Sequence, residues 1–315
     1  MIGAITGDVI GSIYEFNNIK TKDFKLFGPE CRFTDDTVLT VAVADWLLHD
    51  DADLVERLAH YTYAYPNRGY GGMYSKWVDR WDRQPYDSYG NGSAMRVSAV
   101  AWVAKDQTQA LALAKASAEV THSHPEGIKG AQATTLAIWL ARQGAKKERI
   151  RREVTDFSGY DLTETVDEIR EWYYFNETCQ KTVPQAIICA LDATDFEDAI
   201  RNAISIGGDS DTVAAITGSI AQAMFGIPPD IRDKARAYLP DELIEVVDSF
   251  DRLHDPHKSV EQDKAVATNQ LPDPATTTPV VFTKLKPTMT HDEKVDALMK
   301  GLAAQGIKVK PSAKR

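Results

Sequence analysis

The chain has 315 residues, 43% of them hydrophobic and 26% charged, which is typical of a soluble globular protein with one large or two ordinary domains. Its formal net charge of −10 disfavours nucleic acid as a partner of the main domain. The three widely spaced cysteines, Cys31, Cys179 and Cys189, exclude a disulfide framework and a thiolate metal site, and they favour a cytoplasmic location.

The first predicted element is the apolar segment "MIGAITGDVIGSIYEF" at residues 1–16. No basic residue precedes it and Asp8 interrupts it, so it resembles neither a signal peptide nor a membrane-spanning helix. We therefore expect a protein without a membrane partner.

Helical periodicity dominates the chain as far as about residue 255. Apolar residues recur every three or four positions over 38–46 and 213–224, and Gly144 and Gly226 are placed to end helices. Good helix formers are concentrated in four further segments, at 93–104, 108–120, 127–142 and 232–238. Because the alternation typical of strands is scarce, we predict an all-α domain over residues 1–255, built as an orthogonal multi-helix bundle.

The composition changes after residue 255. Residues 256–288, which include "NQLPDPATTTPVV", are predicted to be a Pro/Thr-rich linker. Residues 289–315 are predicted to form a basic amphipathic C-terminal tail, because apolar side chains recur at helical spacing and the segment 284–315 has eight Lys or Arg against three Asp or Glu. This tail either packs on the main domain or contacts a partner.

Two predicted helices begin with paired carboxylates, in "FTDDTV" at residues 33–38 and in "GGDSDTV" at residues 207–213. One interpretation is capping, since Asp and Thr accept hydrogen bonds from the first N–H groups of a helix. Two aspartates at each start are more than capping requires, and adjacent carboxylates repel one another. The alternative is a site for a hard cation, Mg²⁺ or Mn²⁺, which prefers such oxygen ligands.

Two other acidic motifs fit these segments poorly. The second segment lacks the glycine and glutamate that an EF-hand loop requires after its first aspartates. The run "DSDTV" is locally similar to the motif of haloacid dehalogenase phosphatases, but there the motif follows a buried strand. Here Gly207 and Gly208 precede it, and no α/β pattern follows.

Six motifs in order resemble the ADP-ribosylglycohydrolases, also called ADP-ribosyl-acceptor hydrolases. They are "GAITGDVIGSIYEF", "FTDDTVLT", "NRGYGG", "SYGNGSAMRVS", "THSHPEGIKGA" and "IGGDSDTVAAITG", which together extend over most of residues 1–250. The resemblance does not cover residues from about 256 onward.

The resemblance implies a binuclear Mg²⁺ centre, with Mn²⁺ as the alternative, at the N-termini of two helices. Its implied ligands are Thr34, Asp35, Asp36, Asp209, Asp211 and Thr212. Glu15 would face them, as a ligand or as the group that orients water, and would act as base or acid. Glu15, Asp35 and Asp36 are the implied catalytic residues.

The resemblance also implies where the substrate binds. Ser88, Tyr89 and Asn91 would face a diphosphate, and Gly90, Asn91 and Gly92 lead into a helix whose free N–H groups suit phosphate, although this is also an ordinary Gly-rich turn. Gly71 would lie at the ribose, and His122 either near the adenosine or packed in the core. Asp87 either pairs with a guanidinium group of the acceptor or is simply exposed.

The predicted function is that of a Mg²⁺-dependent hydrolase of the glycosidic bond between ADP-ribose and an acceptor. The acceptor is a protein side chain, arginine slightly favoured over serine, or a small molecule. The alternative is an inactive protein of the same fold that binds ADP-ribose or a nucleotide. A third interpretation is a metal-dependent hydrolase of another small phosphate or glycoside.

Overall fold

The computed structural model of the chain describes residues 1–254. The predicted linker at 256–288 and the predicted tail at 289–315 lie outside the described residues. Within residues 1–254 the secondary structure is helical, and extended backbone pairs only at one isolated bridge, between Gly90 and Thr178. The predicted all-α fold is therefore confirmed.

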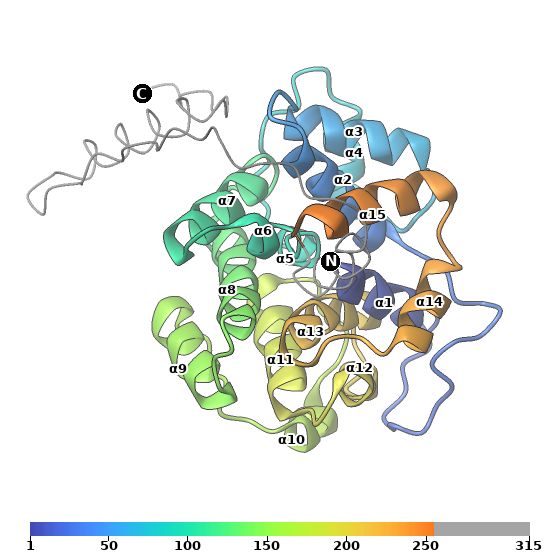
Figure 1. Cartoon of the computed structure of the whole chain (residues 1–315), viewed down its shortest axis with the longest axis vertical. Helices are drawn as coiled ribbons and strands as arrows, with labels where there is room; N and C mark the ends of the chain where they lie inside the picture. The colour runs from blue at the N-terminus through green and yellow to red at the C-terminus, as the bar shows by residue number, and fades with distance from the viewer. Residues whose placement is uncertain (255–315) are drawn as a thin grey trace, which may run out of the picture.

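Fifteen helices make up the described part of the chain. In chain order they are α1 (Ile2–Gly11), α2 (Asp35–Leu48), α3 (Leu54–Ala64), α4 (Gly72–Val78), α5 (Gly92–Met95), α6 (Val100–Val103), α7 (Gln107–Glu119), α8 (Pro125–Arg142), α9 (Lys147–Ser158), α10 (Val166–Trp172), α11 (Cys179–Asp192), α12 (Phe196–Ser205), α13 (Ser210–Phe225), α14 (Pro229–Arg236) and α15 (Asp241–His254). They cross at steep angles, since α8 runs along the long axis of the view while α3 and α15 run across it (Figure 1).

Helix α13 lies at the centre of the bundle. It packs against α1, α8, α11 and α12, and every residue from Ser210 to Gln222 is buried. Such a helix carries apolar or small residues on all sides, as expected for a helix that is buried all round. Its N-terminus, which carries the second acidic motif, is therefore fixed by the surrounding helices.

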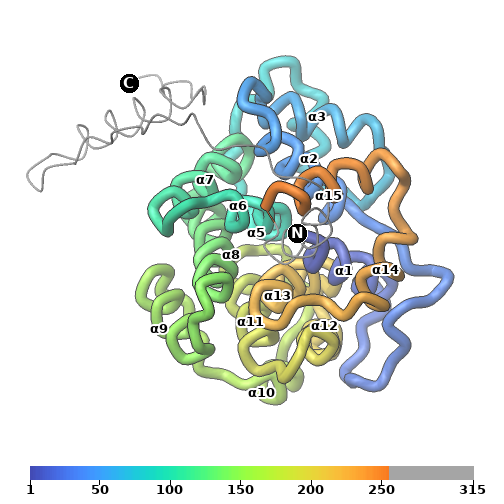
Figure 2. The backbone as a smooth tube through the Cα atoms, viewed as in Figure 1, coloured from blue at the N-terminus to red at the C-terminus, as the bar shows by residue number. Residues whose placement is uncertain are grey.

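The contact between α1 and α13 is unusually close because glycines line it. Gly3, Gly7 and Gly11 recur every four residues, so they lie on one face of α1. A Cβ atom on Gly7 would lie 1.9 Å from the carbonyl oxygen of Ala214, and one on Gly3 would lie 2.3 Å from that of Gly218. The backbones of the two helices thus touch, although they are about 200 residues apart in the sequence (Figure 2).

Most predicted helices are found, and one is broken. The segments at 108–120, 127–142 and 232–238 correspond to α7, α8 and part of α14, and Gly226 follows the last residue of α13. The predicted helix at 93–104 instead forms two short helices, α5 and α6. Residues 93–101 are buried, and they pack against α2, α7, α8 and α13. Packing from several directions overrides the local helix propensity there.

None of the helices within residues 1–254 combines the length and the apolar character that a membrane-spanning helix requires.

Candidate metal centre and substrate site

The start of α2 is capped without the help of its two aspartates' carboxylates. Thr34 is the N-cap residue, and its Oγ1 accepts a hydrogen bond from the backbone N–H of Asp36 at 3.3 Å. Asp8, on α1, accepts hydrogen bonds from the backbone N–H groups of Thr34 at 2.9 Å and of Thr37 at 3.0 Å. The carboxylates of Asp35 and Asp36 are thus free for another role.

The start of α13 is built differently. Gly207 and Gly208 both adopt left-handed conformations, with φ of +70° and +81°. A Cβ atom on Gly208 would lie 2.4 Å from Cε1 of Tyr173, so only glycine fits there. Asp209 is the N-cap residue but makes no capping hydrogen bond with its side chain. Its Oδ2 instead accepts a hydrogen bond from Nδ2 of Asn91 at 2.7 Å.

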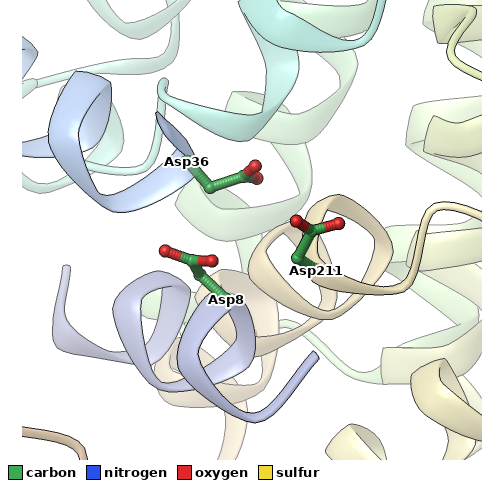
Figure 3. Close-up of side chains that lie close together, drawn as sticks. All are labelled: Asp8, Asp36 and Asp211. Atoms are coloured by element: carbon green, nitrogen blue, oxygen red, sulfur yellow. The ribbon is translucent and has the colours of Figure 1, made fainter. Parts of the chain in front are cut away.

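Carboxylates from α1, α2 and α13 converge on one buried place (Figure 3). One oxygen each of Asp8, Asp36 and Asp211 lie within 4.8 Å of one another. A second group, formed by Glu15, Asp209 and Asp211, meets the same condition. Because Asp211 belongs to both groups, the two are adjacent and share a carboxylate.

Asp8 was not among the residues predicted from the sequence to form the site. It also accepts hydrogen bonds from the hydroxyl groups of Thr34, at 2.7 Å, and Thr37. The available signal was a lone charged residue within an apolar segment, at a helix position adjacent to the glycine face. That signal indicates burial with a partner, but it does not identify the partner.

The other predicted ligands lie around the two groups. Thr212 donates a hydrogen bond from Oγ1 to Oδ2 of Asp36 at 3.1 Å. Asp35 belongs to neither group. Its backbone N–H donates to the carbonyl oxygen of Arg68 at 2.8 Å, and its Oδ1 lies 3.3 Å from where a Cβ atom on Gly69 would be. Asp35 therefore faces the loop that leads to Gly71.

Glu15 is held in place through Asn18. The Nδ2 group of Asn18 contacts three carbonyl oxygens, those of Tyr14 at 2.7 Å, Glu15 at 3.0 Å and Gly208 at 2.9 Å. Its Oδ1 accepts a hydrogen bond from the backbone N–H of Gly208 at 2.7 Å. One amide side chain thus joins the segment that carries Glu15 to the turn that precedes Asp209.

Burial and mutual repulsion raise the pKa values of these carboxylates. Burial, followed by the charge of Asp211, raises the pKa of Asp8 to about 7 and that of the half-buried Glu15 to about 8. The same two causes hold the pKa values of Asp35, Asp36 and Asp209 well above the ordinary range. So many carboxylates at one place require either protons or cations between them.

The oxygen atoms present fit a hard cation. Oδ1 of Asp36 is buried and has no hydrogen-bond partner in the described part of the chain, which is costly for a carboxylate oxygen unless it binds an ion. The donors in both groups are carboxylate oxygens, as Mg²⁺ and Mn²⁺ prefer. The buried acidic residues could therefore hold metal ions.

The predicted diphosphate loop at residues 88–92 is anchored to residues 177–179. The backbone N–H of Asn91 donates to the backbone carbonyl oxygen of Glu177 at 2.7 Å, and that of Gly90 donates to Oγ of Ser88 at 3.1 Å. These two N–H groups, predicted to be free, are thus occupied within the chain. The side chain of Asn91 connects this loop directly to the carboxylate groups, through its hydrogen bond to Asp209.

The remaining predicted residues lie near this loop or near Asp35. Tyr89 is exposed, with its ring centroid 5.2 Å from that of His124. His122 is buried beside Gly90 and Gly92. Asp87 is exposed and has a positive φ of 57°. Gly71 is exposed at the N-terminus of α4.

Most of the chain matches a known protein family. The sequence profile of the ADP-ribosylglycohydrolase family matches residues 1–261. The chain therefore belongs to this family, as the six motifs predicted, and the family's activity is hydrolysis at ADP-ribose.

Individual relatives agree with this assignment. The chain is 26% identical over 323 residues to the ADP-ribosylhydrolase ARH3 of Gallus gallus, which covers 76% of this chain and 88% of that protein. It is 24% identical to the ADP-ribosylarginine hydrolase Tri1 of Pseudomonas putida (strain GB-1), over 74% of this chain and 72% of that one. A solved ADP-ribosylglycohydrolase-related protein complex has the same fold, with a TM-score of 0.58, 22% identity, and coverage of 80% and 96% of the two chains.

Proposed function

We propose that this chain is a Mg²⁺-dependent hydrolase that releases ADP-ribose from an acceptor by cleaving the glycosidic bond. The observation that carries the proposal is the pair of carboxylate groups that share the buried Asp211. Two such groups suit two ions a few ångströms apart, an arrangement that holds substrate oxygens and activates water. Family membership supplies ADP-ribose as the substrate part.

Asp36 and Asp211 would hold one ion with Asp8 or Thr212 beside them, and Glu15, Asp209 and Asp211 the other. Bound there, Mg²⁺ would polarise ribose hydroxyl groups and lower the pKa of an attacking water. Glu15 is the half-exposed member of these groups, so it can exchange a proton with that water or with the leaving group. Asp8 supports the site from behind by fixing the first turn of α2.

On the substrate side, residues 88–92 would face the diphosphate, with His122 next to them and Gly71 at the ribose. Asn91 links this loop to the carboxylate groups. Its side chain bonds to Asp209 at 2.7 Å and to Oγ1 of Thr182 at 3.2 Å. A diphosphate on this loop would therefore place its ribose toward the carboxylate groups.

Arginine is the acceptor that we favour. Asp87 is exposed, directly precedes the diphosphate loop, and suits a guanidinium group. The relatives include both an ADP-ribosylarginine hydrolase and ADP-ribosylhydrolases named ARH3, so the assay must compare acceptors directly.

The decisive experiment measures ADP-ribose release from two peptides, one modified on arginine and one on serine. Each is run with Mg²⁺, with Mn²⁺ and with EDTA, for the wild type, for Asp211→Asn and for Asp51→Asn, an exposed control. We expect metal-dependent release that is lost in Asp211→Asn and kept in Asp51→Asn. Tight binding of ADP-ribose by calorimetry without any release would instead establish a binding protein.

We also propose that the chemistry belongs to residues 1–255 and that the rest of the chain is dispensable for it. The family profile ends at residue 261, close to this boundary. A chain truncated after residue 261 should therefore keep the release rate of the full chain. A truncated chain that folds but releases no ADP-ribose would assign part of the site to the removed residues.

A further inference from the structure

A buried arginine without an acidic partner lies behind the proposed diphosphate loop. The side chain of Arg96 is fully buried, and it forms no ion pair with any residue in the described range 1–254. Its Nη2 donates hydrogen bonds to the carbonyl oxygen of Ser117 and to Oγ1 of Thr121, both at 2.8 Å. Its Nε and Nη1 atoms have no hydrogen-bond partner among residues 1–254. Burying a charge in this way costs several kcal/mol, so a structural role alone explains it poorly.

The arginine acts on a histidine through one hydroxyl group. Oγ1 of Thr121 lies 2.7 Å from Nδ1 of His122. Because a guanidinium group only donates hydrogen bonds, Thr121 must accept from Arg96, and its own hydrogen is left for another acceptor. The two acceptors within reach are Nδ1 of His122 and the carbonyl oxygen of Ala118, which is 3.5 Å away. The contact to Nδ1 of His122 is the shorter of the two, which favours a hydrogen bond in which Thr121 donates to Nδ1.

This direction of the bond determines where the imidazole carries its proton. When Nδ1 accepts a hydrogen bond, the proton of a neutral imidazole resides on Nε2. Burial and the charge of Arg96 both lower the pKa of His122 well below its ordinary value, so the ring is neutral. His122 thus offers a single N–H donor, on the side away from Thr121.

That donor points at the loop. Nε2 of His122 lies 3.2 Å from where a Cβ atom on Gly92 would be, and 3.6 Å from one on Gly90. Since both residues are glycines, neither of them places a side chain against this edge of the ring. Nε2 makes no hydrogen bond with residues 1–254, whereas Nδ1 is bound. The ring of Tyr86, at 6.0 Å between centroids, packs beside it.

We propose that Arg96 is a positioning residue that acts through Thr121 to fix His122 in the Nε2–H form, so that His122 donates a hydrogen bond to the ligand held by residues 88–92. The ligand class is a nucleoside diphosphate or ADP-ribose, and this part rests on the proposed function. Arg96 itself does not touch the ligand. Its buried charge acts by polarising and orienting a two-step chain of hydrogen bonds.

The first test reads the position of the proton directly, in the free protein. NMR of protein labelled with ¹⁵N in its histidines distinguishes a protonated from an unprotonated ring nitrogen, and the variant His122→Gln identifies the signals of this ring. We expect Nδ1 unprotonated and Nε2 protonated in the wild type and in Thr121→Ser. Thr121→Val should show a mixture of the two forms, as should Arg96→Met if it folds. A wild-type ring with its proton on Nδ1 would overturn the proposal.

The second test measures the affinity for ADP-ribose by calorimetry. Thr121→Val loses one oriented donor, so its affinity for ADP-ribose should be about fivefold lower than that of the wild type. The affinity of Thr121→Ser should stay within about twofold of the wild type. Thr134→Val is the matched control, because Oγ1 of Thr134 is buried and has no hydrogen-bond partner within residues 1–254. Equal weakening in Thr121→Val and Thr134→Val would show a packing effect only and overturn the proposal.

The two tests separate this inference from the proposed function. A wild-type protein that does not bind ADP-ribose would contradict the proposed function and the ligand part of the inference. The spectrum would still decide whether Arg96 and Thr121 set the position of the proton on His122.

Discussion

The two acidic helix starts have almost the same sequence but different supports. At the start of α2, Thr34 and the distant Asp8 provide the capping hydrogen bonds. At the start of α13, a turn of two left-handed glycines sets the backbone, and Asp209 bonds to Asn91 and not to its own helix. At the start of α13, Oδ1 of Asp211 accepts a hydrogen bond from the backbone N–H of Thr212 at 3.0 Å, whereas among the described residues the side chains of Asp36 and Asp209 make no capping bond. The two starts therefore share carboxylates beyond those that capping uses, and not the way in which the helix begins.

Helix α1 and the residues that follow it serve both starts. Asp8 fixes the first turn of α2, and Asn18 binds the turn before α13. A Cβ atom on Gly11 would lie 2.5 Å from Cα of Asp211, so the backbone of α1 also fixes the position of Asp211. Four experiments test how far the two starts depend on this common support.

The largest effect should come from Gly7→Val, which would affect both starts at once. Its side chain would overlap the backbone of α13, because a Cβ atom there lies 1.9 Å from the carbonyl oxygen of Ala214. Neither backbone can move without disrupting its packing, so we expect a loss of roughly 3 kcal/mol or more in the free energy of unfolding. Urea unfolding followed by circular dichroism measures it. Gly28→Ala is the control, because no atom of the described residues lies within 4 Å of where its Cβ would be. Equal stability of the two variants would show that α1 and α13 are not in contact.

The next largest effect should distinguish Asp211 from Asp35. Asp211 belongs to both carboxylate groups and Asp35 to neither. Calorimetry with Mg²⁺ should therefore show a loss of affinity of about 100-fold or more for Asp211→Asn, and a smaller loss for Asp35→Asn. If Asp35→Asn were the more damaging substitution, the ions would lie closer to the start of α2 than the carboxylate groups indicate.

Removal of metal should make stability depend on pH. The unfolded chain releases the protons of Asp and Glu near their ordinary pKa values of 3.8 and 4.5, whereas the metal-free fold keeps those of Asp8 and Glu15 up to about pH 7 and about pH 8. Raising the pH from 5 to 8 removes protons that the folded state binds more tightly, so it lowers stability. In EDTA we expect Tm to fall by about 5 °C between pH 5 and pH 8, because Asp8 and Glu15 lose their protons.

The control for that measurement is the same titration with saturating Mg²⁺. Cations between the carboxylates replace the protons, so the fall in Tm should be much smaller. Two identical curves would argue against a metal at this place.

The smallest effect should come from Asn18→Ala, which affects only the start of α13. It removes the amide that joins the Glu15 segment to Gly208. We expect an affinity for Mg²⁺ that is about tenfold lower, since groups that orient ligands contribute on this scale. Asn17→Ala, at an exposed position next to it, should leave the affinity unchanged. An equal loss in both variants would show that the segment is merely sensitive to substitution.

The sequence is sufficient to predict the helical fold and those carboxylates that are close together along the chain. Periodicity and helix formers predict α7 and α8 because each has its own local pattern. The break between α5 and α6 could not be predicted in this way, because packing with helices from other parts of the chain decides it.

A motif that carries its own chemistry predicts members of the carboxylate groups, as at Asp36 and Asp211. Asp8 was missed because its partners, Thr34 and Thr37, are recruited by the packing of α1. Asn18 and the chain from Arg96 to His122 were missed for the same reason. Each acts through a contact between segments that no local spacing reveals.

The close contact of α1 with α13 has a consequence for how the protein is made. The two carboxylate groups draw on residue 8 and on residues 209 and 211, so they cannot assemble while the ribosome has produced only the first half of the domain. During that time the apolar α1 lacks the helix that buries it. Contacts this distant in sequence also form slowly, so that face stays uncovered by α13 until late in synthesis.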